Sequence, residues 1–264
     1  MHPIEHLRHL ARVDSSEAAG LVAETATALG SLRNDPATLV VACRRILERH
    51  ASVGPMWWLC SHLLLAADPG DRSWELADEV ASDATPGHLA ARLAPDSHVL
   101  TGGIDLTLIE AVADRGDVTV ACLALGDAVR LVRRAARFGV PIEPLDTSEL
   151  SDAAARCDAA VISLRAGSPA GLLVARDAAL VARTAAAAGT PVWLVAPTGT
   201  CLPDRYVTAI GEAGASALSE LEPSLIAAVI GPAGFETDVT AAVRPTAPMA
   251  PELLRVTPSP VGAR

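Results

Sequence analysis

Residues 4–93 carry a helical pattern of apolar positions. The residues that mark its first turns, three or four positions apart, are Leu7, Leu10, Val13, Val22, Ala26 and Leu29. This spacing is typical of helices that bury one face. Asp35-Pro36 has the residue types that begin a helix, and Gly54-Pro55 and the Asp68–Asp71 segment mark further breaks. The pattern predicts an all-helical N-terminal domain over residues 1–94.

The period of the apolar positions changes after Pro95. Strands are predicted at 98–101, 118–125, 140–142, 159–164 and 191–196, and helices at 106–116, 128–139 and 177–189. Strands that are apolar on both faces and alternate with helices indicate a parallel sheet covered on both sides. We therefore predict an α/β fold, a Rossmann-like doubly wound parallel sheet, over residues 95–240.

The last segment, residues 241–264, is rich in proline and has few long apolar runs. Its prolines are Pro245, Pro248, Pro251, Pro258 and Pro260. This composition predicts a C-terminal tail that runs extended over the surface and frays at its end.

Composition and charge exclude several classes of function. No apolar run reaches the roughly 18 residues that a membrane span needs, and the charged, His-rich start does not read as a signal peptide. We therefore expect a cytoplasmic protein with no membrane partner. The net charge of −10 argues against binding to nucleic acid. The chain contains no lysine, which excludes Schiff-base chemistry and a Walker A phosphate loop.

Few side chains offer acid–base or metal chemistry in the predicted sheet domain. All seven histidines lie at or before His98, so carboxylates and cysteines would have to carry any reaction there. The five cysteines lie far apart without metal-ligand spacing, and we expect buried, reduced thiols and no metal. Trp57 and Trp58 lie in an apolar helix and are interpreted as core, not as a stacking platform.

The loops after the predicted strands are the candidate ligand site, because open parallel sheets bind ligands beyond the carboxyl ends of their strands. In the 101–105 loop, two glycines allow backbone amides to approach a phosphate, or the loop is a tight turn that Asp105 caps. Asp127 is either a helix cap or a ribose-binding acid. Arg165 either binds a phosphate with two N–H groups of its guanidinium group or is a solvated loop residue.

The loop after the last predicted strand, 196–201, is rich in hydroxyl groups and can line a polar pocket. No GxGxxG follows the first strand and no GxSxG is present, so no cofactor is implied and no catalytic residue is assigned. The candidate ligand-binding residues are Thr101, Gly102, Gly103, Asp105, Asp127, Arg165 and Thr198.

Two stretches resemble a known family. They are VLTGGIDLTLIEAV, residues 99–112, and DAAVISLRAGSPAGLLVARDAALVARTAAAAGTPVWLVAPT, residues 158–198, which carries most of the likeness. The sequence is similar, over roughly residues 15–215, to the superfamily of translation initiation factor two-B alpha, beta and delta subunits. That superfamily also includes the aldose-1-phosphate isomerases that act on methylthioribose-1-phosphate and ribose-1,5-bisphosphate.

The sequence departs from this family at two positions that the isomerases use for catalysis. The isomerases carry a catalytic cysteine after the first sheet strand and a catalytic aspartate after a later one. In this chain the matching places hold Gly103 and Arg165. Isomerisation needs one group that opens the ring and another that moves a proton, and both are replaced.

The resemblance therefore implies a degenerate member, which binds a phosphorylated sugar or nucleotide in a regulatory or assembly role without isomerase chemistry. The alternative is a sugar-phosphate (aldose–ketose) isomerase with a non-standard acid–base pair, such as Asp105 and Asp127. Guanine-nucleotide exchange in translation is a third possibility, disfavoured because the chain reads as bacterial. Because members of the family pair through their sheet domains, and the mean hydropathy is +0.33, we expect a homodimer.

Overall fold

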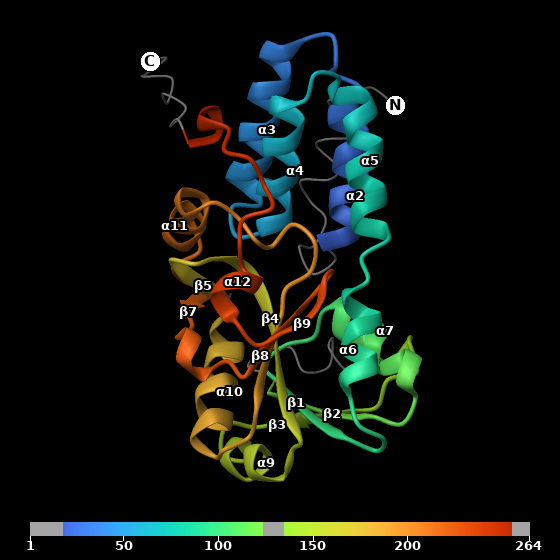
Figure 1. Ribbon diagram of the computed structural model, residues 1–264, viewed down its shortest axis with the longest axis vertical. Helices are drawn as coiled ribbons and strands as arrows, with labels where there is room; N and C mark the ends of the chain where they lie inside the picture. Colours follow the sequence, from blue (N-terminus) through green and yellow to red (C-terminus); the bar gives the residue numbers. More distant parts are fainter. Residues whose placement is uncertain (1–17, 124–134, 255–264) are drawn as a thin grey trace, which may run out of the picture.

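A helical bundle stands at the edge of an α/β sheet domain (Figure 1). The computed structural model of the protein describes residues 18–123 and 135–254. The bundle consists of α2 (Ala18–Gly30), α3 (Pro36–Arg49), α4 (Gly54–Leu65) and α5 (Pro69–Ala81). The predicted helical N-terminal region is therefore present over these residues. None of the described helices is long and apolar enough to cross a membrane.

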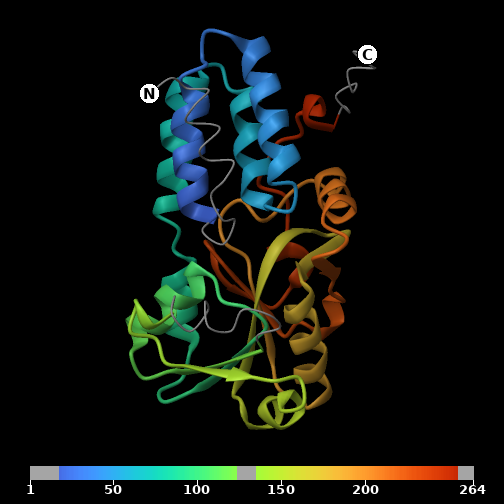
Figure 2. The same ribbon diagram turned by 180° about the vertical axis from the view of Figure 1, so that it is seen from behind.

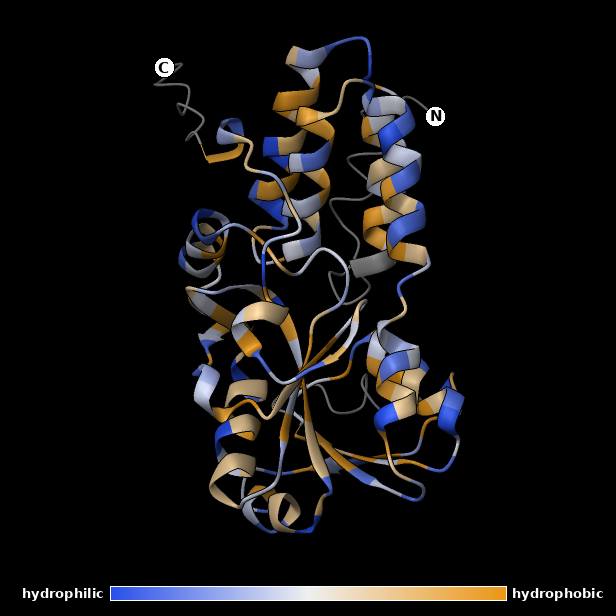
Figure 3. Cartoon of the chain, viewed as in Figure 1, coloured by the Kyte–Doolittle hydropathy of each residue, from blue (hydrophilic) through white to orange (hydrophobic). Residues whose placement is uncertain are grey.

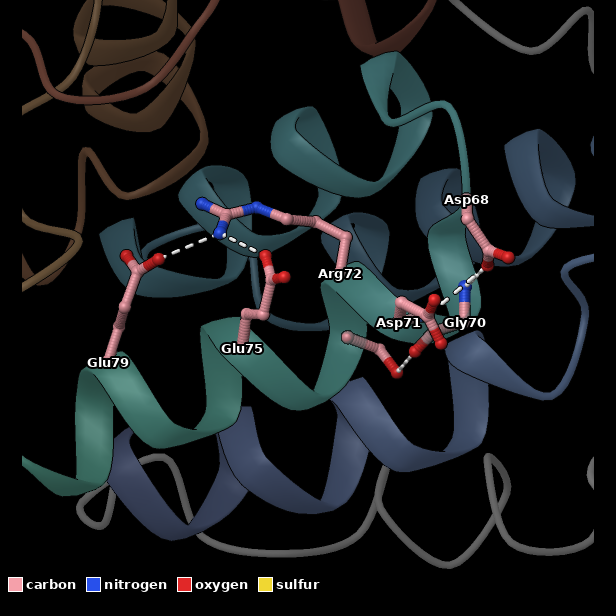
Figure 4. Close-up of polar contacts among 7 residues, drawn as sticks. Asp68, Gly70, Asp71, Arg72, Glu75 and Glu79 are labelled. Carbon is pink, nitrogen blue, oxygen red and sulfur yellow. Dashed lines mark hydrogen bonds and ion pairs between the residues drawn. The ribbon is translucent and has the colours of Figure 1, made fainter.

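Local hydrogen bonds at the helix starts agree with the sequence signals. Asp35 accepts a 3.0 Å bond from the Thr38 amide at the start of α3. Asp68 accepts bonds from two amides of α5, of 2.8 and 3.2 Å (Figure 4). One turn further on, Arg72 lies 2.8 Å from both Glu75 and Glu79. These ion pairs are partly exposed, so they contribute little stability beside the caps and the core.

Helix α4 is the centre of the bundle, because most of its residues are buried. Trp57 and Trp58 are 6% and 2% exposed, and the Trp57 indole donates a 3.0 Å hydrogen bond to the Ala51 carbonyl. Trp57 also packs against Tyr206 of α11 (Asp204–Ala213), with ring centroids 5.2 Å apart. The interpretation of the two tryptophans as core is confirmed.

The sheet has the order β3-β2-β1-β4-β6-β8-β9, and all neighbouring pairs from β3 to β8 are parallel. The prediction of an α/β fold with a mostly parallel sheet is confirmed. Its strands are β1 (His98–Thr101), β2 (Thr119–Leu123), β3 (Ile142–Leu145), β4 (Ala159–Ser168), β6 (Val192–Val195), β8 (Ala228–Gly231) and β9 (Gly234–Glu236). The strand order reverses between β1 and β4, which makes this point the switch point where such sheets bind ligands.

Antiparallel additions extend the sheet in a way that the sequence did not predict. Strand β4 runs on beyond its parallel partner β6 and pairs with β5 (Gly171–Ala175), and β5 pairs with β7 (Leu218–Glu220). Strand β9 also lies antiparallel, beside β8. Strands β7 and β9 are only three residues long, whereas β5 has an apolar sequence, Leu-Leu-Val-Ala, that was not recognised as a strand.

Helices cover both faces of the sheet (Figures 1 and 2). Helices α6 (Thr85–Arg92) and α7 (Leu106–Arg115) lie on one face, and α9 (Leu150–Arg156) and α10 (Arg176–Ala187) on the other. Helix α6 falls inside the predicted helical domain, 1–94, but it packs against α7 and β8 of the sheet domain. The bundle therefore ends at α5.

Hydrophobic residues predominate along the strands, and in the bundle helices they alternate with hydrophilic residues (Figure 3). One buried cluster lies on each face of the sheet. A third cluster fills the bundle and continues into α11 and β4 through residues such as Ala166, Leu202 and Ile210. The bundle and the sheet domain thus share apolar core, which fixes one against the other.

Up to residue 254, the C-terminal segment packs against the bundle and does not run over the surface, whereas the predicted frayed end lies outside the described residues. After α12 (Val239–Ala242), the chain crosses to the bundle and forms a turn at Pro251–Leu254. The Tyr206 hydroxyl accepts a 2.6 Å bond from the Ala250 amide and lies 3.1 Å from the Ala250 carbonyl. Arg44 donates to the Glu252 carbonyl at 2.8 Å. Ala250 and Leu253 are buried, so the segment packs as part of the structure up to residue 254.

Candidate functional site

A cavity of about 560 Å³ lies between the bundle and the carboxyl edge of the sheet. Its walls come from α2 and α5, from the start of α4, from the α5–α6 junction, from the loops that follow β1 and β6, and from Leu164 and Arg165 within β4. The segment with Arg165, which was predicted as a loop, is therefore part of a strand. The polar residues that line it are Ser52, Asp83, Asp105, Thr107, Glu110, Arg165, Thr198 and Thr200. The cavity therefore lies where the doubly wound topology places ligands.

Arg165 lies on a β-bulge in the wall of this cavity. The register between β4 and β5 shifts between Leu164 and Ala166, so Arg165 is the extra residue. Bulges redirect a side chain from the regular alternation of a strand. Arg165 is partly buried, and within residues 18–123 and 135–254 its side chain makes no hydrogen bond or ion pair. An arginine without a carboxylate partner in a cavity wall is suited to bind an anion.

The start of helix α4 lies directly on this bulge. A Cβ atom added to Gly54 would come within 2.3 Å of the Arg165 carbonyl oxygen, so only glycine allows this approach. Helices α7 and α10 also begin at the cavity, through Thr107 and Ala175. Helix N-termini carry partial positive charge, and those of α4 and α10 have no side-chain cap, so these two ends add to the field of Arg165.

The loop after β1 is built differently from the phosphate loop that its glycines suggested. The Thr101 hydroxyl donates a 2.7 Å bond to the Gly103 carbonyl. A Cβ atom on Gly102 would meet the backbone of Ala178 at 2.4 Å, so this glycine admits the start of α10. None of Thr101, Gly102 and Gly103 lines the cavity. Close packing thus explains Gly102, whereas a Cβ atom on Gly103 would meet no atom within 4 Å. A role of this loop in ligand binding stays a prediction.

Asp105 does line the cavity, and it also caps a helix. Its side chain accepts a 3.0 Å bond from the Leu108 amide, so the interpretation as the cap of α7 is confirmed. Thr198 and Arg165 line the same cavity. Three of the predicted site residues therefore come together. Asp127 lies outside the described residues.

Two acidic residues of the cavity, Asp83 and Glu110, were missed by sequence reasoning. Glu110 lies in the first half of α7, where the sequence reads as an ordinary solvated helix face. Burial raises the pKa of Glu110 above its usual 4.5, and the nearby carboxylates of Asp105 and Asp83 raise it further. Asp83 precedes α6 and accepts a 2.7 Å bond from the Thr198 amide, across the chain. Only the tertiary structure brings these residues together.

The thiols near this region are inert. Burial raises the pKa of Cys122 to about 12 and that of Cys201 to about 11. At neutral pH both groups remain protonated, so neither is an activated nucleophile. All five cysteines are free, and only Cys157 is more than marginally exposed. The prediction of buried, reduced thiols is confirmed for the other four.

No family model matches the chain, and no curated protein matches it in sequence. Solved structures do match. The archaeal translation initiation factor eIF-2B from Pyrococcus horikoshii OT3 aligns with a TM-score of 0.76 at 11% identity, over 90% of this chain and 98% of that one. The chain has the eIF2B fold.

Two fungal structures extend the comparison. The tetrameric eIF2B beta–delta complex from Chaetomium thermophilum aligns with a TM-score of 0.69 at 18% identity, over 89% of this chain and 90% of the other. The eIF2B beta structure from the same organism gives 0.66 at 17% identity, over 91% and 90%. The eIF2B fold thus accounts for both the bundle and the sheet domain, and the predicted resemblance is confirmed for the fold.

Proposed function

We propose that the protein is a degenerate relative of the eIF2B and sugar-phosphate isomerase superfamily that binds a phosphorylated sugar or nucleotide in a regulatory or assembly role. The single observation that carries this proposal is Arg165. It is a cation without a protein partner among the described residues, on the wall of a cavity at the switch point of the sheet. A phosphate there would receive two parallel hydrogen bonds from the guanidinium group.

The remaining polar groups of the cavity suit the rest of such a ligand. Asp105, Glu110 and the hydroxyl groups of Thr107 and Thr200 line the same space. Carboxylates accept hydrogen bonds from sugar hydroxyls, whereas they repel a second phosphate. We therefore infer that the phosphate lies on the side of Arg165 and that the hydroxyl groups of the ligand face Asp105 and Glu110.

The proposal excludes isomerase chemistry because Gly103 and Arg165 stand where the family carries its catalytic cysteine and aspartate. The neighbouring thiols do not replace the lost cysteine, since their pKa values lie far above neutrality. We further propose that the protein acts in the cytoplasm as a homodimer. The complex formed by the fungal beta and delta subunits supports an assembly role for this fold.

One observation favours the alternative of a non-standard isomerase. Glu110 lines the cavity beside Asp105, and its raised pKa suits a group that donates and accepts a proton. The acid–base pair would then consist of Asp105 and Glu110.

The test combines thermal shift, calorimetry and NMR. Ribose 1,5-bisphosphate, methylthioribose-1-phosphate and AMP are added to the wild-type protein. A ligand at a hundredfold excess over its Kd stabilises the fold by about 2.7 kcal/mol, which is readily seen as a higher Tm. NMR of the same sugar phosphates then detects any isomer formed. No stabilisation by any of the three contradicts the proposal, and turnover favours the isomerase.

A further inference from the structure

Asp83 lies in the short connection between the bundle and the sheet domain. This connection, residues 82–84, joins α5 to α6. Helix α5 packs against α2 and α4 of the bundle, whereas α6 packs against α7 and β8 of the sheet domain. A residue in this connection therefore lies at the junction of the bundle and the sheet domain.

Both oxygens of the Asp83 carboxylate accept hydrogen bonds. Oδ1 accepts from the Thr85 amide at 2.9 Å and from the Thr85 hydroxyl at 2.5 Å. Oδ2 accepts from the Thr198 amide at 2.7 Å. The first two bonds hold the carboxylate in one orientation, and the third ties it to a residue 115 positions away. Bonds from amides to a carboxylate are charge-assisted and thus stronger than neutral ones.

Thr198 lies in a loop that is also held by other contacts, since the next residue, Gly199, lies against Pro55 and Trp58 of α4. The C-terminal end of the loop is bonded to β4 of the sheet domain, because the Gly167 amide donates to the Thr200 carbonyl at 2.8 Å. The Thr200 hydroxyl donates to the Pro197 carbonyl at 2.7 Å. The Thr198 amide donates its hydrogen bond to Asp83, and both Asp83 and Thr198 line the cavity.

We infer that Asp83 is a positioning residue of the cavity. Its carboxylate holds the Thr198 loop against the α5–α6 connection, and this sets the distance between the loop wall of the cavity and the bundle. The effect on ligand affinity rests on the proposed function, whereas the effect on the loop does not. A site whose walls are fixed in advance binds without the cost of ordering them.

The first experiment measures amide hydrogen exchange in the protein without ligand. Asp83→Ala removes all three bonds, and we expect exchange in segment 197–200 to become about tenfold faster, since a charge-assisted bond is lost. Exchange within α4 should stay unchanged. Asp83→Asn retains one oxygen for the Thr198 amide and should give a smaller acceleration.

Thr85→Val is the matched control. It removes the hydroxyl bond to Oδ1 but leaves the Thr198 amide bond, so exchange in segment 197–200 should stay within about twofold of the wild type. Unchanged exchange in folded Asp83→Ala would overturn the inference. Equal acceleration in α4 would also overturn it, because the effect would then be a general loss of stability. If Asp83→Ala does not fold, Asp83→Asn is compared with Thr85→Val. Faster exchange of segment 197–200 in Asp83→Asn alone supports the inference, and equal exchange in the two variants overturns it.

The second experiment measures affinity by calorimetry, with AMP, which carries one phosphate, as the probe. The Kd of Asp83→Ala should rise by about tenfold, that of Asp83→Asn by less, and that of Thr85→Val by no more than about twofold. An Asp83→Ala protein that binds as tightly as the wild type would contradict a positioning role. If the wild type binds no phosphorylated ligand, the proposed function fails, and the exchange experiment still decides whether Asp83 holds the loop.

Discussion

The substitution Arg165→Ala is the sharpest test of the ligand site. Arg165 has no carboxylate partner among the described residues, so truncation breaks no ion pair there. A hydrogen bond to a charged group contributes about 1.5–3 kcal/mol, and the loss of the guanidinium group should weaken a phosphorylated ligand by that amount. Since each 1.4 kcal/mol corresponds to about tenfold in affinity, the Kd should rise by roughly 10- to 150-fold.

Stability should change little in the same variant. The backbone bonds of β4 on either side of the bulge do not involve the Arg165 side chain. The Tm should therefore stay close to that of the wild type. Arg165→Lys keeps the charge but loses the fork of donors, and we expect it to fall between the wild type and Arg165→Ala in affinity.

The assay is calorimetric titration with ribose 1,5-bisphosphate or AMP, together with thermal melting of each variant. Arg205→Ala is the matched control, because Arg205 is exposed on α11 and does not line the cavity. A purely structural Arg165 would give the opposite pattern, a lower Tm and an unchanged affinity. If Arg165→Ala binds a ligand of the wild type with unchanged affinity, the proposed ligand site at Arg165 is refuted.

Four further predictions follow from the charges and the fold. Glu110→Gln should tighten the binding of sulfate, an anion with no hydroxyl group for a carboxylate to accept from, at neutral pH, because a negative charge is removed. The gain should vanish in titrations at acidic pH, where Glu110 takes up a proton. Burial and Arg72 lower the pKa of His62 below its usual 6.5. The unfolded chain therefore binds more protons below pH 6.5, so stability should fall as the pH drops and fall less in His62→Phe, as measured by urea unfolding. Sedimentation should show a homodimer with an interface above roughly 2,000 Å², and a 27.1 kDa species alone at micromolar concentration would exclude it. Methylthioribose-1-phosphate and ribose 1,5-bisphosphate should not be isomerised above background, and NMR turnover of about 1 per second or more would contradict this.

Local signals in the sequence determined much of the fold. Asp35-Pro36 predicted a helix start because an aspartate side chain satisfies free amides of the first turn and proline needs none. The alternation of short apolar runs with helices of about a dozen residues predicted the parallel sheet, since strands buried on both faces are apolar throughout. The same topology rule pointed to the loops with Asp105, Arg165 and Thr198, and all three line the cavity.

Only the tertiary structure decided what each of these residues does. The place of Arg165 on a bulge depends on the register in which β4 pairs with β5, and no local pattern in the sequence displays that register. Gly102 reads as part of a phosphate loop until the backbone of Ala178 is found against it.

The residues around Asp83 and Thr198 in the sequence do not indicate that these two are hydrogen-bonded. The proline-rich segment packs against the bundle through the hydrogen bond between the Ala250 amide and the Tyr206 hydroxyl. Helix caps and hydrophobic periods arise from interactions between residues a few positions apart, so the sequence displays them. Bulges, close backbone approaches and cavity walls arise between segments that only the folded chain brings together.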